Sequence, residues 1–346
     1  MTLSTVEKLS SGPPAPEPRQ TTPNGERQPV IIRPVHDQGV VWRNGQLVPF
    51  ADATCHVLSH MAARGSQVFD VMLVTKAGGT PSAVGLRAHV ARFLRSAELM
   101  GMEDVGEVGD LERAVAQTVT ANASPVSQNA TYRGCFVVKL IAGWTEEAIG
   151  VMPADVRPTV YVVVLPTGGE EVFEVLKSPV KVKSATMPKM PAEILPPSMK
   201  VAASYTPGLR EQLQARAEGF DHTVFKTVAG DLAESTTLSM LVVTNGRILA
   251  PPLDSVLDGI TRRIVLDVAQ DAGIPVEVRA IGWDEVLEAD ELFLSSTTHP
   301  IVPVALLDQQ GYDAPGPVTR ALAMAMTELY AGGHRLSEQW LTPLRT

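Results

Sequence analysis

The feature that most constrains the fold is a hydrophobic pattern that switches between strand and helix periods on both sides of a break at residues 166–169. The break reads Pro-Thr-Gly-Gly, a combination that interrupts regular structure. Runs of β-branched residues and strict alternation are typical of strands, whereas apolar residues three and four apart are typical of helices. We therefore predict an α+β chain in two parts. In the first part, strand patterns cover residues 68–74, 134–143 and 159–165, and helical patterns cover residues 86–97 and 111–119.

The second part repeats the same two patterns in a different order. Residues 187–197 are rich in proline, which disrupts helices, so we expect an ordered loop there.

Turn residues add a signal in both parts of the chain: Asn-Gly pairs at residues 44–45 in the first part and 245–246 in the second predict tight β-hairpins. In the first helix of the second part, Leu209 and Leu213 lie on one apolar face. Strands are predicted at residues 180–183, 248–249, 276–280, 292–294 and 301–307, with two more within residues 224–243 around residues 229–231. Helices are predicted at residues 209–217, 260–272 and 318–329.

Composition adds domain boundaries to these patterns. Residues 1–29 are rich in Ser, Pro, Thr and Gln and have no period, so their burial cannot offset their ordering entropy. We predict a disordered arm for that segment. Residues 30–165 are predicted to form a small N-terminal α+β domain, residues 166–171 a linker, and residues 172–346 a large C-terminal domain.

Net charge and cysteine content argue against several classes of partner and site. The chain has 346 residues, 45% of them hydrophobic, and a formal net charge of −9. That acidic balance, without a Lys/Arg-rich block, argues against a nucleic-acid partner. Two cysteines, Cys55 and Cys135, build neither a disulfide framework nor a CxxC metal pair, so we expect a cytoplasmic protein. No apolar run has membrane-spanning length, no signal-peptide pattern is present, and the histidines lack metal-site spacing, so we assign no membrane and no metal.

Three features between residues 199 and 263 point to one chemistry. Lys200 lies on an extended apolar run, where desolvation lowers the pKa of an amine and leaves it free to condense with a carbonyl. Glu234 ends a predicted strand and would keep a ring nitrogen protonated. Gly259 opens a helix whose first N–H groups suit a phosphate. An aldehyde, a ring nitrogen and a phosphate together describe pyridoxal 5'-phosphate (PLP).

Each of these features also has an ordinary explanation. Most lysines are solvated, acidic residues in loops are usually exposed, and most helix starts bind nothing. Lys139 and Lys226, each on an apolar strand, remain rivals to Lys200 as the reactive amine. Arg92 and the polar run at residues 295–298 are the groups best suited to hold a phosphate.

Taken together, these residues resemble the class IV PLP-dependent aminotransferases. That family includes branched-chain and D-amino-acid aminotransferases, (R)-selective amine transaminases and aminodeoxychorismate lyases. The resemblance extends from about Trp42 to Gly333, and its motifs occur in family order. It implies a small N-terminal α+β domain and a larger C-terminal, cofactor-binding domain with a barrel-like sheet. The motifs lie at residues 44–49, 56–60, 65–70, 89–93, 200–205, 233–234, 259–262, 296–298 and 316–320.

The resemblance also implies roles for individual residues. Lys200 would form a Schiff base with PLP and move the proton between substrate and cofactor. Glu234 would pair with the pyridine nitrogen, and Tyr205 would hydrogen-bond the ring oxygen. The phosphate would be held by Arg92, Thr297 and the N–H groups of Ile260 and Thr261, with Ser235 and Thr236 also beside the cofactor, and the substrate would be contacted by Thr298, Arg64, Phe69 and Phe136.

The implied reaction is a ping-pong transamination from an amino acid to a 2-oxo acid or ketone, in a homodimer with residues of both subunits near the site. Departures from the family pattern concern the substrate: Arg64 replaces a tyrosine, and Phe136 begins the segment that replaces a Tyr-x-Arg motif. Branched-chain-like donors are the default. A D-amino-acid enzyme, an (R)-selective amine transaminase and a lyase are alternatives. A non-catalytic binding module ranks last, because Lys200 and Glu234 are both present.

Overall fold

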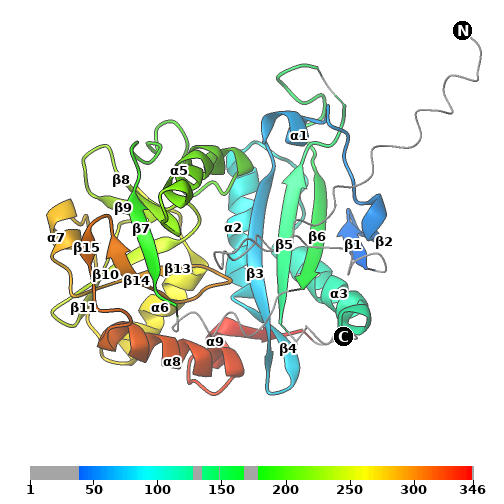
Figure 1. Cartoon of the computed structure of the whole chain (residues 1–346). Coiled ribbons are helices and arrows are strands. Elements are labelled where there is room, and N and C mark those ends of the chain that lie inside the picture. Colours follow the sequence, from blue (N-terminus) through cyan, green and yellow to red (C-terminus); the bar gives the residue numbers. More distant parts are fainter. Residues whose placement is uncertain (1–38, 128–134, 148, 167–177, 345–346) are drawn as a thin grey trace, which may run out of the picture. The chain divides into compact units, whose positions relative to one another are not determined.

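The computed structural model describes residues 39–127, 135–147, 149–166 and 178–344 (Figure 1). The predicted arm and nearly all of the predicted linker lie outside these residues. Within them, no helix combines the length and the apolar character that a membrane crossing requires.

The described part of the first half contains an antiparallel sheet. Its first hairpin turns at Asn44 and Gly45, whose φ angles of 44° and 94° lie in the left-handed region, which confirms the Asn-Gly prediction. The sheet order is β16-β4-β3-β5-β6-β1-β2. The strands are β1 (Val40–Arg43), β2 (Gln46–Pro49), β3 (Val68–Ala77), β4 (Thr80–Val84), β5 (Phe136–Gly143), β6 (Thr159–Pro166) and β16 (Leu341–Pro343).

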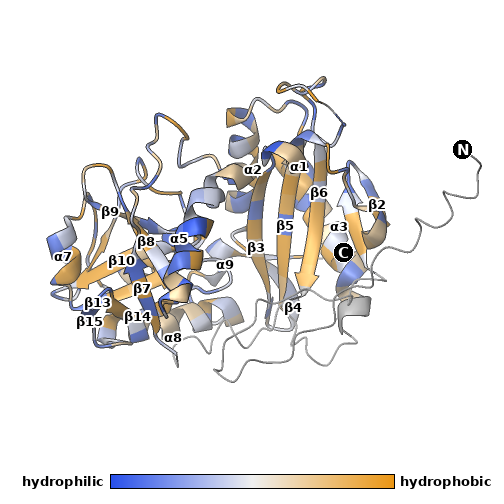
Figure 2. Ribbon diagram, turned by 45° about the horizontal axis from the view of Figure 1, so that its top comes forward, coloured by the Kyte–Doolittle hydropathy of each residue, from blue (hydrophilic) through white to orange (hydrophobic). Residues whose placement is uncertain are grey.

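Two predicted helices cover one face of this sheet, α2 (Leu86–Leu99) and α3 (Val108–Ser127). Alternation along β5 sends Val138 and Leu140 toward them, where both join a core with Phe93 of α2. Figure 2 shows β3, β5 and β6 as largely hydrophobic strands, as expected of a sheet buried on both faces. A shorter helix, α1 (His60–Arg64), precedes β3 and was not predicted.

The second sheet is mixed and curls back on itself. Its order is β12-β11-β10-β13-β14-β7-β8-β9, with β15 paired to β14. In a flat sheet, β9 and β10 would lie about 24 Å apart across five strand spacings, but residues 236–238 reach at most about 14 Å. The sheet therefore curls, which confirms the barrel-like expectation. Its strands are β7 (Val180–Ser184), β8 (His222–Lys226), β9 (Leu232–Ser235), β10 (Ser239–Thr244), β11 (Arg247–Ala250), β12 (Val276–Val278), β13 (Glu291–Ser295), β14 (Val302–Leu307) and β15 (Gln310–Gly311).

Two helices pack between the sheets, α6 (Ile260–Asp271) and α8 (Pro317–Ala331). Ile264 of α6 and Leu322 of α8 share one core with Leu73 of β3 and Phe293 of β13. A separate core on the other face of the second sheet takes in α7 (Trp283–Leu287). The chain then returns through α9 (Ser337–Trp340) to β16, so its last strand belongs to the first sheet and not to the predicted C-terminal domain.

The helix α5 (Thr206–Ala217) is confirmed, but its predicted apolar face is not buried. Leu209 and Leu213 are 56% and 59% exposed, whereas Gly208 and Glu211 are buried. A Cβ at Gly208 would lie 2.7 Å from Thr236 Cγ2, so this face of the helix approaches the sheet at its smallest residue. Close backbone packing therefore decided the orientation that hydrophobic spacing had predicted wrongly.

Candidate active site

The segment that carries Lys200 is fixed against the first sheet. Its carbonyl oxygen accepts a hydrogen bond from the Phe69 N–H at 3.0 Å, and its own N–H donates to Ser96 Oγ of α2 at 3.0 Å. The neighbours Met199 and Val201 are buried in the core beneath α2. Because successive side chains of an extended segment point in opposite directions, Lys200 faces away from that core.

The Lys200 amine lies among polar and aromatic groups. Its Nζ donates to Tyr205 Oη at 2.5 Å and lies 4.8 Å from the centre of the Phe69 ring. Burial, and then the positive charge of Arg92, lowers the pKa of Lys200 to about 8 against the opposing effects of Asp70 and other acids. Burial raises the pKa of Tyr205, so its hydroxyl keeps its proton. A neutral amine is therefore accessible slightly above neutral pH, as the sequence predicted.

Glu234 lies on β9, all four residues of which are buried. Its Oε1 accepts a hydrogen bond from the Leu257 N–H at 3.1 Å and forms an ion pair with the Lys189 ammonium. The second oxygen, Oε2, accepts no hydrogen bond from the part of the chain that the structure describes. One carboxylate oxygen is thus anchored, while the other is available to a further donor.

Arg92 is held by a carboxylate that sequence reasoning did not single out. Asp70 on β3 is fully buried, and its two oxygens accept from Arg92 Nε at 2.7 Å and Nη2 at 2.9 Å. Burial alone would raise the pKa of Asp70, but the charge of Arg92 and contact with His89 hold that pKa below its usual range. Burial lowers the pKa of His89 despite its 2.7 Å contact with Asp70. The remaining nitrogen of the Arg92 guanidinium, Nη1, does not contact Asp70 and donates instead to the Asp258 carbonyl at 2.8 Å.

Asp258, whose carbonyl accepts that hydrogen bond, immediately precedes the N-cap of α6. Gly259 is the N-cap and provides no side-chain cap. Within the described residues, the N–H groups of Ile260 and Thr261 donate no hydrogen bond. The guanidinium of Arg92 and two unpaired N–H groups at the positive end of a helix dipole are therefore brought together, an arrangement that suits a phosphate.

Of the other predicted cofactor residues, Thr297 and Thr236 have hydroxyls that are hydrogen-bonded within the protein, whereas the hydroxyl of Ser235 is not bonded to any described residue. Thr297 Oγ1 donates to the Val71 carbonyl of β3 at 3.1 Å, which ties the two sheets together. Thr236 Oγ1 contacts Thr223 Oγ1 at 2.8 Å. The Ser235 hydroxyl is buried without a partner among the described residues. Thr298, a predicted substrate contact, lies in the same loop as Thr297, with Oγ1 at 2.9 Å from His299 Nδ1.

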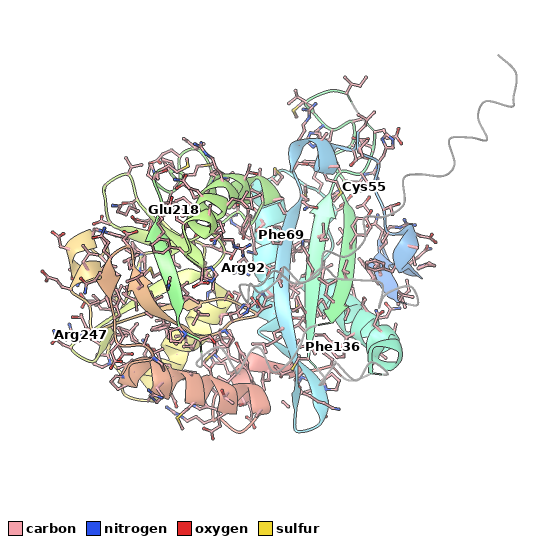
Figure 3. All side chains as sticks on the ribbon, viewed as in Figure 1. Cys55, Phe69, Arg92, Phe136, Glu218 and Arg247 are labelled. Atoms are coloured by element: carbon pink, nitrogen blue, oxygen red, sulfur yellow. The ribbon has the colours of Figure 1, made fainter. Side chains whose placement is uncertain are left out.

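Two predicted substrate residues are directed elsewhere. Phe136 pairs with Val74, five positions along β3 from Phe69, and its side chain is buried in the core beneath α2. Figure 3 shows Phe136 toward the far end of β5 from Phe69. Arg64 is exposed, and its Nη2 donates to the carbonyls of Ile149 and Gly150, each at 3.0 Å. The prediction failed for Phe136 because a shift of one residue on a strand reverses the face.

Lys139 takes the place on β5 that sequence reasoning gave to Phe136. Its Nζ lies 4.8 Å from the centre of the Phe69 ring, the same distance as that of Lys200. Burial, and then the charge of Lys200, lowers the pKa of Lys139. The rival Lys226 is elsewhere, with its ammonium over the Trp283 ring. Phe69 pairs with Ile141, so Lys139, two residues away on β5, lies on the same face of the sheet as Phe69. That pairing, used in place of the motif, would have identified Lys139.

These groups fit PLP on the structure's own evidence. Lys200 provides a partly buried amine with a lowered pKa, Glu234 provides a free oxygen in a buried carboxylate, and the start of α6 provides unpaired N–H groups next to Arg92. An aldehyde, a ring nitrogen and a phosphate each meet a group of matching chemistry.

The fold and this constellation define a class IV aminotransferase, and residues 67–307 match the family described as amino-transferase class IV. The chain belongs to that family. It is 26% identical over 309 residues to the branched-chain-amino-acid aminotransferase of Pseudomonas aeruginosa, covering 88% of this chain and 97% of that one. Its structure is similar to the branched-chain aminotransferase from Thermoproteus uzoniensis with norvaline, with a TM-score of 0.81 and 26% identity over 89% of this chain and 99% of that chain.

A second similar structure is the branched-chain amino acid aminotransferase from Thermobaculum terrenum in its PLP form. It has a TM-score of 0.79 and 26% identity, and the match covers 89% of this chain and 98% of that chain. Each of these relatives is thus matched over nearly its whole length.

Proposed function

We propose that this aminotransferase binds PLP on Lys200 and transfers amino groups from branched-chain-like amino acids to 2-oxo acids. Bound PLP supplies an aldehyde and a ring that withdraws electrons from the substrate Cα. The observation that carries the proposal is the Lys200 amine, which is partly buried, has a pKa lowered to about 8 and contacts the Tyr205 hydroxyl. The named relatives, all branched-chain aminotransferases, support the choice of donor.

The protein's own groups divide the work. Lys200 Nζ, whose pKa is lowered to about 8, would take up and return the proton of the substrate Cα. Tyr205 Oη, which keeps its proton because burial raises its pKa, would donate a hydrogen bond to the ring oxygen of bound PLP. Glu234 would face the ring nitrogen of bound PLP, and Arg92 with the start of α6 would hold its phosphate.

Lys139 supports carboxylate-bearing substrates. It is partly buried, faces the same aromatic ring as Lys200, and forms no ion pair within the described residues. A half-desolvated ammonium without a counter-ion favours an anionic ligand. We expect Lys139→Met to raise KM for 2-oxo acids about tenfold, the cost of one charge-assisted hydrogen bond, with little change for uncharged ketones. Lys226→Met, which removes an ammonium over Trp283, is the matched control.

Borohydride reduction of the PLP-loaded protein followed by peptide mapping tests the covalent site. We expect the label on Lys200; a label on Lys139 or on no lysine would overturn the proposal. A donor panel containing both enantiomers of several amino acids and of an aryl amine, with pyruvate or 2-oxoglutarate as acceptor, tests the reaction. Preference for D-amino acids or (R)-amines would replace the donor assignment, and turnover without amination of the acceptor would indicate a lyase.

We further propose a homodimer in the cytoplasm. Five large apolar side chains are exposed on two loops beside α1. His60 of α1 connects the two loops, because its Nε2 donates a hydrogen bond to the Val151 carbonyl at 2.6 Å. Exposed apolar clusters mark interaction surfaces. Val151→Asp should convert the dimer to monomers in analytical ultracentrifugation, whereas Met324→Asp, on the exposed side of α8, should not. The free thiols of Cys55 and Cys135 suit a reducing compartment. The five side chains are Val57, Leu58, Ile149, Val151 and Met152.

A further inference from the structure

The proline-rich segment before Lys200 has no assigned role in the chemistry. Residues 187–197 form neither helix nor strand, as predicted, yet the segment is anchored, because the Lys189 N–H donates to the Lys226 carbonyl at 2.8 Å. That bond fixes the start of the segment beside β8. Lys189 is the segment's single lysine, and its ammonium forms an ion pair with Glu234.

The two oxygens of Glu234 are not equivalent. Oε1 accepts from both Lys189 Nζ and the Leu257 N–H, whereas Oε2 accepts nothing from the described part of the chain. Two donors converging on one oxygen from different segments fix the plane and direction of the carboxylate. They leave the second oxygen at a defined place in the site.

Charge balance gives Lys189 a second effect on the same carboxylate. The side chain of Glu234 is only 9% exposed, and a buried carboxylate is costly without a cation beside it. Arg92, another cation of the site, is already bonded to Asp70. Lys189 is therefore the cation that Glu234 contacts directly among the described residues.

We propose that Lys189 is a positioning residue, which holds Glu234 Oε1 so that Oε2 meets the ring nitrogen of PLP. This inference rests on the proposed function, since it requires Glu234 to face that nitrogen. In this arrangement Lys189 acts on the cofactor only through Glu234, whose Oε1 it contacts. The proline-rich segment then holds the Lys189 ammonium against Glu234 Oε1, the oxygen that does not face the ring nitrogen.

The test compares three variants of the full chain. Lys189→Met removes the charge, Lys189→Arg keeps it, and Lys183→Met removes an ammonium that pairs with Glu218 outside the site. Lys183 and Lys189 have the same side-chain exposure, 27%, which makes Lys183 a matched control. The readouts are the absorbance spectrum of bound PLP, its dissociation constant from fluorescence quenching, and the melting temperature of the protein without PLP.

We expect Lys189→Met to shift the absorbance maximum and to raise the dissociation constant about 10- to 100-fold, the range for losing the charged hydrogen bond between Glu234 Oε2 and the ring nitrogen. Lys189→Arg should restore most of both, and Lys183→Met should match the wild type. If Lys189→Met lowers only the melting temperature and leaves the spectrum and the dissociation constant unchanged, the ion pair is merely structural and the proposal is wrong.

A double-mutant cycle tests whether Lys189 acts through Glu234. In a Glu234→Gln background, Lys189→Met should change the spectrum little further, and an undiminished effect would overturn the proposal. Borohydride trapping separates this failure from failure of the proposed function. A wild-type label on Lys200 supports the proposed function whatever the Lys189 variants do, whereas its absence removes the basis for both.

Discussion

Replacing Asp70 with asparagine tests whether the buried carboxylate behind Arg92 balances the charge of that guanidinium at the start of α6. Asparagine has nearly the same shape, but it lacks the charge and turns one of two acceptor oxygens into a donor. With Oδ1 kept as the acceptor for His89 and Arg92 Nη2, the new amide faces Arg92 Nε, which now donates to Oδ2 at 2.7 Å. One hydrogen bond is lost and two donors oppose each other.

The magnitude follows from burial. Asp70 is fully buried and the Arg92 side chain is 9% exposed. Removing one partner of such a pair leaves an uncompensated buried charge, which costs about 3–5 kcal/mol. That is a large part of the free energy of unfolding of a typical protein, about 5–15 kcal/mol. Asp155 and Arg157 make a similar two-point contact on the surface, with Nε donating to Oδ1 and Nη2 to Oδ2, so Asp155→Asn is the matched control and should leave stability unchanged.

The assay is thermal unfolding of the protein without PLP, in a phosphate-free buffer and then with increasing inorganic phosphate. With Asp70→Asn, Arg92 remains tied to the Asp258 carbonyl and still faces the two unpaired N–H groups of α6. Phosphate at one hundred times its dissociation constant stabilises a protein by about 2.7 kcal/mol. At equal phosphate concentration we expect the stabilisation to be larger for the variant, in which Arg92 has lost its carboxylate partner, than for the wild type. A loss of stability below about 1 kcal/mol, or an equal response of both proteins to phosphate, would refute the reasoning.

Two further outcomes are expected. Gly316→Ala should destabilise the protein by about 2–4 kcal/mol, because the new Cβ would lie 2.2 Å from Cδ of Glu291, whose carboxylate caps α8. The control is Gly282→Ala, at another N-cap with negative φ, where the nearest atom to the new Cβ is 3.8 Å away. It should leave the free energy of unfolding unchanged in the same assay. Since the neutral form of Lys200 increases as pH rises toward its pKa of about 8, the rate of PLP uptake by the cofactor-free protein should rise roughly tenfold per pH unit below that value and flatten above it. A stopped-flow uptake profile that is flat from pH 6 to 8 would contradict the lowered pKa.

Local signals predicted local structure. Both Asn-Gly turns form hairpins, with Asn44 and Asn245 at positive φ. The spacing of residues 260–272 predicted α6 within one residue of its observed end. These predictions held because the conformation of a tight turn or an amphipathic helix is decided by neighbours in sequence.

Contacts between distant segments had no such signal. Nothing near Leu341 indicates that β16 pairs with β4, and nothing near Leu209 indicates that α5 presents Gly208 to the sheet. The lysine, acid and glycine of the site were chosen for their chemical types, which are visible in sequence. Asp70 and Lys189, the partners that hold Arg92 and Glu234, were missed because an ion pair 22 or 45 residues apart leaves no local pattern.

The pairing of charges explains how an acidic chain builds a site for anions. Arg92 is bonded to Asp70 and Lys189 to Glu234, so these two pairs are electrically balanced. Lys200 and Lys139 form no ion pair within the described residues, so when both are protonated they leave an excess of positive charge in a protein whose net charge is −9. The phosphate of a cofactor and the carboxylate of a substrate would offset that excess. Until they bind, burial and neighbouring positive charges lower the pKa of both lysines, so that near pH 8 a large share of the Lys200 amine is neutral and able to attack an aldehyde.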